Sequence, residues 1–164
     1  EGVQWVMSQE VNKGITDGEF IDRFKVGSSA FYTELTMRIG TLAGTSDCAF
    51  GFRKVEAFQA NVDDYDEAAF LNCIAGSVKS ETILNAGTTS TSASLYSMTA
   101  DAPVKLGVYV SKLGVVSMKV NGKTITDPSM TFDASEVLTP FWFFLQNSTT
   151  TDDVILEKLI VSRQ

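Results

Sequence analysis

The densest group of ionisable side chains in the sequence is the stretch Asp63-Asp64-Tyr65-Asp66-Glu67. Carboxylate oxygens bind hard cations such as Ca²⁺, but this spacing does not match an EF-hand loop, which also needs a glycine at its sharp turn. A glycosidase needs two carboxylates that face each other across a cleft, and the sequence has no second acidic cluster that could supply the other carboxylate. We therefore interpret the stretch as a solvated loop at the rim of an interface, where Asp63, Asp64, Tyr65 and Asp66 contact a partner.

The sequence contains no histidine. Histidine is the commonest general base and the commonest transition-metal ligand, so Ser-His-Asp, Cys-His and histidine-based zinc sites are excluded by composition. Glycine-rich phosphate loops and Cys-x-x-Cys pairs are absent as well. We expect no catalytic residue, no metal site and no cofactor, and we predict that the protein is not an enzyme.

The run Phe141-Trp142-Phe143-Phe144 is the densest aromatic stretch. Aromatic faces suit the C–H surfaces of sugars, so one interpretation is a sugar-stacking platform. In a strand, Phe141 and Phe143 would share one face and Trp142 and Phe144 the other. We favour a core role because large aromatic rings are typical core fillers, with a sugar site or a protein interface as the alternatives.

Composition limits the possible partners. The chain has 164 residues, a formal net charge of −7 and a pI near 4.5. Nucleic acids and anionic membrane surfaces are disfavoured as partners because binding them requires clustered lysine and arginine. The two cysteines, Cys48 and Cys73, are too few for a disulfide framework, and we expect buried free thiols.

The length fits one domain with an N-terminal extension. Residues 1–8 read as a short strand, and residues 9–23 contain turn signals at Asn12-Lys13-Gly14 and Asp17-Gly18 that predict a loop. We divide the chain into an arm over residues 1–23 and a domain over residues 24–164. The arm carries Trp5 and Val6, and we interpret it as a tether to a partner.

The rest of the chain alternates at the strand period of two. The clearest region is residues 103–126, where Gly114 and Asn121-Gly122 suit tight turns between three antiparallel strands. Further strands are predicted at 24–26, 31–39, 48–55, 68–74, 78–84, 95–98, 138–146 and 154–161, with loops at 56–67 and 85–94. So many short strands with almost no helical pattern predict an all-β fold of two packed antiparallel sheets.

The stretch KLGVYVSKLGVVSMKVNGKTIT, followed by an aromatic strand and a final apolar strand, resembles the late hairpin of concanavalin A-like jelly-roll domains. The stretch CAFGFRKVEAFQANVDDYDEAAFLN is similar to domains of this type in virion proteins of tailed bacteriophages. The family includes lectins, laminarinase-type glycosidases and structural modules. The Glu-x-Asp-x-x-Glu pattern of the glycosidases and the histidine of the legume-type metal site are both missing here.

This resemblance implies a non-catalytic virion module, such as a capsid decoration protein or a head or tail surface protein, located on the capsid or tail surface. Its expected partners are the major capsid protein or another virion protein, together with further copies of itself. The alternative is a lectin-like carbohydrate-binding module on a viral or bacterial surface, with a surface glycan as its partner.

Overall fold

The computed structural model describes residues 5–10, 15–20, 23–125, 127–146 and 153–164, the first two ranges by their backbone alone. The described strands form two antiparallel sheets. The larger sheet has nine described strands: β1 (Trp5–Glu10), β2 (Ile15–Phe20), β3 (Phe24–Lys25), β5 (Thr45–Lys54), β6 (Ala68–Ile74), β7 (Ser77–Ile83), β8 (Ser90–Thr91), β9 (Tyr96–Ser97) and β13 (Val137–Gln146). The smaller has five: β4 (Phe31–Ile39), β10 (Val104–Val110), β11 (Val116–Val120), β12 (Lys123–Ile125) and β14 (Val154–Arg163).

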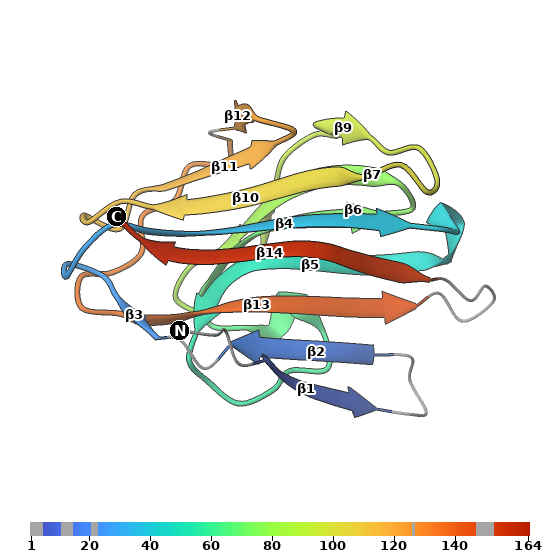
Figure 1. The fold of residues 1–164 in the computed structure, drawn as a ribbon. Coiled ribbons are helices and arrows are strands. Elements are labelled where there is room, and N and C mark those ends of the chain that lie inside the picture. Colours follow the sequence, from blue (N-terminus) through green and yellow to red (C-terminus); the bar gives the residue numbers. More distant parts are fainter. Residues whose placement is uncertain (1–4, 11–14, 21–22, 126, 147–152) are drawn as a thin grey trace.

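Strands that are neighbours in space are often distant in sequence. The main order in the larger sheet is β1-β2-β13-β5-β6-β7-β8, and the order in the smaller sheet is β12-β11-β10-β4-β14. Figure 1 shows the smaller sheet lying in front of β5, β6 and β7. The described helices are the short 3₁₀ turns η1 (Leu42–Gly44) and η2 (Val62–Asp64), and neither is long enough to cross a membrane. This architecture confirms the predicted two-sheet antiparallel sandwich.

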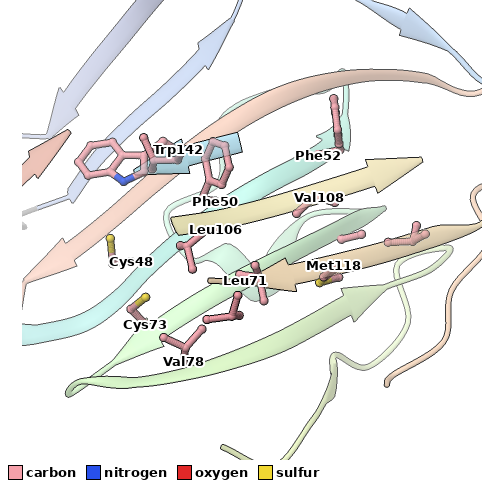
Figure 2. Packing of buried hydrophobic residues seen from close by; sticks show 14 of the residues in the cluster. Cys48, Phe50, Phe52, Leu71, Cys73, Val78, Leu106, Val108, Met118 and Trp142 are labelled. Carbon is pink, nitrogen blue, oxygen red and sulfur yellow. The ribbon is translucent and has the colours of Figure 1, made fainter. Parts of the chain in front are cut away.

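The main hydrophobic core lies between the two sheets. Alternate residues of the central strands point into this core, as the burial of Phe50 and Phe52 on β5 and of Leu106 and Val108 on β10 shows. Removing such a side chain from water stabilises the fold by about 1.5–3 kcal/mol. Figure 2 places Cys48 and Cys73 in this core, which confirms that both are buried thiols that form no disulfide with each other.

The strands β10, β11 and β12 form the antiparallel meander that the sequence predicts. Asn121 and Gly122 both have positive φ angles, +49° and +83°, as a type I′ turn requires. The Asn121 side chain also accepts a hydrogen bond from the backbone N–H of Lys105 at 2.9 Å. Gly114, at a φ of +85°, ends the turn of the first hairpin, and its N–H donates to the carbonyl oxygen of Ser111 at 2.9 Å. The turn residues and the strand register therefore agree.

The N-terminal residues depart from the prediction. Residues 9–23 were expected to form a loop, but Ile15–Phe20 form β2, which pairs with both β1 and β13. The β1–β2 hairpin thereby extends the larger sheet at one edge (Figure 1). Trp5 and Val6 belong to β1, and their side chains lie outside the described residues, so a tethering role for the arm stays a prediction. In the predicted loop 85–94, Ser90–Thr91 form the short strand β8.

Gly51 on β5 pairs with Phe70 on β6 at a place that leaves no room for a side chain. A Cβ at this position would meet the carbonyl oxygen of Ala69 at 2.2 Å and the Cα of Phe70 at 2.7 Å. The sequence predicts a bulge or a close backbone approach here, because glycine interrupts the run between Phe50 and Phe52. The structure shows the close approach.

Candidate functional site

The acidic loop between β5 and β6 folds over the outer face of the larger sheet. Tyr65 of this loop is 1% exposed and packs with Val62, Phe70 and Phe141 in a second hydrophobic cluster. The Tyr65 ring lies 5.8 Å from the Phe141 ring and 4.6 Å from the guanidinium carbon of Arg53. Tyr65 therefore covers the sheet, and its ring is not at the solvent-facing rim that the sequence suggested.

The aspartates of the same loop remain at the surface. Asp63 accepts a hydrogen bond from the hydroxyl of Thr89 at 2.8 Å, and Asp66 lies 3.9 Å from the Lys54 amine. Asp64 is exposed. Within the described residues, no three or more histidine, cysteine, aspartate or glutamate side chains are grouped so that they could hold a metal ion. Contact of the three aspartates with a partner stays a prediction.

The aromatic strand β13 has both of its faces covered. Phe141 and Phe143 pack in the outer cluster under the acidic loop, whereas Trp142 and Phe144 pack between the sheets. All four side chains are buried, with at most 7% of any of them exposed. The core role predicted for this run is confirmed. None of its four rings is exposed enough to stack on a sugar.

A buried polar network lies beside this cluster on the outer face of the larger sheet. The side-chain amide of Asn72 donates hydrogen bonds to Asp47 at 2.8 Å and to Glu81 at 2.9 Å. Its carbonyl oxygen accepts one from the backbone N–H of Cys48 at 3.0 Å. Burial raises the pKa of both carboxyl groups above their ordinary values, and the hydrogen bonds from Asn72 oppose this only in part. The network joins β5, β6 and β7.

The raised pKa of Glu81 implies that the free energy of unfolding depends on pH. The folded state holds the proton to a higher pH than the unfolded state does, so this group lowers the free energy of unfolding as pH rises above the unfolded-state pKa of about 4.3. We expect Glu81→Gln to remove this loss. Relative to the unchanged protein, the variant should gain stability between about pH 4 and pH 7.

Urea unfolding across that pH range measures the effect. Thr91→Val is the companion variant, because Thr91 donates a hydrogen bond to Glu81 at 3.3 Å that lowers the pKa of this carboxyl. Losing that bond should raise the pKa of Glu81 further, so the unfolding free energy of Thr91→Val should fall more between low and neutral pH than that of the unchanged protein. A stability difference between Glu81→Gln and the unchanged protein that is the same at every pH would contradict the prediction.

The outer face of the smaller sheet carries an aromatic pair. Tyr32 on β4 and Tyr109 on β10 lie directly opposite in the strand register, and both are half-buried. Their rings stack with centroids 5.4 Å apart and an interplanar angle of 16°. Lys119, on the other neighbour of β10, places its amine 4.5 Å from the Tyr109 ring centroid. We call these two rings the tyrosine platform.

Hydrogen bonds fix the position of Tyr109. Its hydroxyl donates to the Glu34 carboxylate, which also lies 2.8 Å from the Lys105 amine. Partial burial works to raise the pKa of Glu34, but the hydrogen bonds from Lys105 and Tyr109 outweigh it and bring the net pKa below its ordinary value. Burial and the bond to Glu34 hold the pKa of Tyr109 well above its usual range. At neutral pH the phenol therefore keeps its proton and donates a hydrogen bond to the ionised carboxylate.

Gly107, which has no side chain, leaves room for the Tyr109 ring. A Cβ at Gly107 would lie 3.0 Å from a ring carbon and 3.2 Å from the hydroxyl oxygen of Tyr109. Gly107 also pairs with Glu34 in the strand register. The Tyr109 side chain therefore passes over Gly107 to reach the Glu34 carboxylate. The ring therefore lies along its own strand, close to the sheet.

Two hollows border the tyrosine platform. The larger has a volume of ≈ 430 Å³, and its lining includes Tyr109, Ser111, Ser117, Lys119 and Gln164. The smaller, of ≈ 100 Å³, is lined by Glu34, Thr36, Lys105, Lys158 and Ile160. An aromatic surface next to hydroxyl, amine, amide and carboxylate groups can stack on one face of a ligand while hydrogen-bonding its edge.

The comparisons with known proteins concern the fold. No protein-family model matches the sequence, and no curated protein does either. An alginate lyase of Pseudomonas aeruginosa is 16% identical, with a TM-score of 0.66 over 99% of this chain and 82% of that chain. The carbohydrate recognition domain of Emp46p, in a potassium-bound form, is 10% identical, with a TM-score of 0.70 over 96% of this chain and 88% of that one. The carbohydrate-binding module CBM66 of Bacillus subtilis is 12% identical, with a TM-score of 0.58 over 96% and 94% of the two chains.

These similarities confirm the concanavalin A-like jelly-roll sandwich. They contradict the prediction that the protein is not an enzyme, because alginate lyases share this sandwich over 98–99% of the chain. That prediction relied on the missing histidine and the missing Glu-x-Asp-x-x-Glu pattern. Since the same fold supports lyases, neither absence is a ground for excluding catalysis. The virion origin suggested by the sequence stays a prediction.

Proposed function

We propose that this chain is a carbohydrate-binding jelly-roll domain and that its glycan contacts the tyrosine platform on the outer face of the five-stranded sheet. The observation that carries the proposal is the half-buried, stacked pair of Tyr32 and Tyr109 beside the hollow of ≈ 430 Å³. Among the structures that share the fold are a carbohydrate recognition domain and a carbohydrate-binding module. This favours a glycan over other ligands of similar size.

The groups around the platform match the surface of a sugar ring. A pyranose presents C–H bonds on its faces and hydroxyl groups around its rim, so it suits an aromatic ring flanked by hydrogen-bonding side chains. Ser117 and Lys119 on one side of Tyr109 and Glu34 on the other can supply these hydrogen bonds. The bond from Tyr109 to Glu34 fixes the ring before a ligand arrives, which lowers the entropic cost of binding.

The sequence resemblance suggests where such a domain would act. A carbohydrate-binding sandwich on a capsid or tail surface would attach a virion to surface glycans of its host. This location is part of the proposal and is tested by whether the native protein co-purifies with assembled particles.

Binding is tested by screening the protein against immobilised neutral and uronic oligosaccharides, with and without Ca²⁺, and by titration calorimetry of the ligands found. Both ligand classes belong in the screen because lysines and a carboxylate border the platform. We expect saturable binding to one class of glycan. Binding to none of them would contradict the proposal. The same incubations are analysed for shortened products, whose release would assign an enzyme that acts on the bound glycan.

A further inference from the structure

We propose that β14, the last strand of the five-stranded sheet, pairs with β14 of a second copy of this chain across a two-fold axis. Among the described residues, β14 pairs with β4 alone and forms one end of the strand order. An edge strand presents a row of free N–H and C=O groups to which another strand can bond. This proposal is independent of the carbohydrate site.

The apolar side chains of β14 are unusually exposed for a strand of a sandwich. Ile155 on its outer face is 47% exposed, and Leu156 on its inner face is 36% exposed. Val154, Leu159 and Val161 reach the core but are only partly buried. The edge of the sheet is therefore both open and apolar, which is a surface that soluble proteins generally cover.

The sequence of this edge is chemically symmetric. Residues 154–161 read Val-Ile-Leu-Glu-Lys-Leu-Ile-Val, which is the same read from either end once glutamate is matched with lysine. An antiparallel pair centred between Glu157 and Lys158 therefore brings like apolar residues together: Val154 with Val161, Ile155 with Ile160 and Leu156 with Leu159 of the second copy. It also brings Glu157 opposite Lys158 twice.

The irregularity in β14 makes this register geometrically possible. A two-fold axis normal to a sheet keeps each side chain on its own face, and in a regular strand an axis between two residues would place inner residues opposite outer ones. Here the register with β4 shifts between Leu156 and Lys158, which leaves Glu157 as the extra residue of a β-bulge. Beyond it, Leu159 faces inward like Leu156, and Ile160 faces outward like Ile155.

This symmetry identifies the second strand as another copy of the same chain. A second copy that runs antiparallel to the first presents the same residues in reverse order, so each apolar side chain of this edge meets one of its own kind. A strand from another protein would not in general carry that order. The central charges add specificity, because opposite charges across antiparallel strands attract and like charges repel. Glu157 also contacts Arg38 of its own sheet at 2.6 Å, so a test of the dimer has to separate this intramolecular ion pair from the charge pair between copies.

Analytical ultracentrifugation over a dilution series of the intact chain tests the proposal. We expect a monomer–dimer equilibrium. Lys158→Glu places a glutamate opposite Glu157 at two symmetric positions and should raise the dimer dissociation constant about tenfold or more. The combined change Glu157→Lys with Lys158→Glu restores opposite charges and should bring the dissociation constant back to near its original value.

Arg38→Gln is the control for the intramolecular ion pair, and it should leave the dimer unchanged. Thermal unfolding shows that each variant is folded, and hydrogen exchange locates the contact: amides of residues 154–161 should exchange more slowly as concentration rises. A monomer at every concentration would overturn the proposal. So would a dimer that Lys158→Glu does not weaken, a combined variant that stays as weak as the single one, or concentration-dependent protection confined to another strand.

Discussion

Gly51→Ala is expected to destabilise the fold by about 3 kcal/mol and to lower the melting temperature by roughly 6–12 °C. The added methyl group would lie 2.2 Å from the carbonyl oxygen of Ala69 and 2.7 Å from the Cα of Phe70, and both of these atoms are backbone. No side chain can rotate away to relieve the contact, so β5 and β6 must separate. Because these strands lie in the middle of the larger sheet, the separation disturbs both hydrophobic clusters. Urea and thermal unfolding measure the loss.

Gly122→Ala is the matched control for this substitution. Gly122 has a φ of +83° but nothing within 4 Å of the position of a Cβ, so alanine there costs only the strain of a left-handed backbone, about 1–2 kcal/mol. Gly51 should therefore be the more costly position. If the two variants unfold at the same temperature, the close approach of β5 and β6 is not what requires the glycine.

Tyr109→Ala is expected to weaken glycan binding at least tenfold, which corresponds to about 1.4 kcal/mol, while leaving the chain folded. The change removes one ring of the tyrosine platform and one wall of the hollow of ≈ 430 Å³. Its cost to stability should be about 1 kcal/mol, because a cross-strand aromatic pair on an open sheet face contributes no more than that. Titration calorimetry with the glycan found in the screen measures the affinity.

Tyr109→Phe separates stacking from hydrogen bonding. Phenylalanine keeps the ring over Gly107 but cannot donate a hydrogen bond to Glu34. We expect this variant to retain most of the affinity. Equal binding by the alanine variant and the unchanged protein would place the glycan elsewhere on the sandwich, even if the protein remains a carbohydrate-binding domain.

Much of the sandwich can be predicted from the sequence because its signals are local. Asn121-Gly122 specifies its own turn, and strict alternation over residues 31–39 specifies which side chains of β4 are buried. Gly51 between two phenylalanines indicates a close approach without reference to distant residues. Each of these features depends on a few neighbours along the chain.

The strand β2 could not be predicted in this way. Its sequence contains Asp17-Gly18, which is a turn signal when read alone, but in the structure Gly18 lies opposite Trp142 of β13. A partner strand from the far end of the chain thus determines the conformation of residues that local preference assigns to a loop. Tertiary pairing outweighs propensity at such positions.

The candidate site was missed for a related reason. Tyr32 and Tyr109 each occupy an outward position of a half-polar strand, and neither residue alone indicates a platform. They become a pair only through the register between β4 and β10, which no sequence pattern states. The same applies to Asp47, Asn72 and Glu81, which come together from β5, β6 and β7.

The place of Tyr109 relative to the free edge of its sheet has a consequence for valency. β10 lies two strands from the edge, beyond β4 and β14. In the proposed two-fold pair, five inter-strand steps of about 4.8 Å separate the two copies of β10, which puts the two platforms roughly 24 Å apart across the strands. The axis is normal to the sheet, so both platforms face the same direction. Such a dimer would bind two sugar units of a dense glycan layer at once, and its avidity would depend on glycan density more than on the affinity of either site.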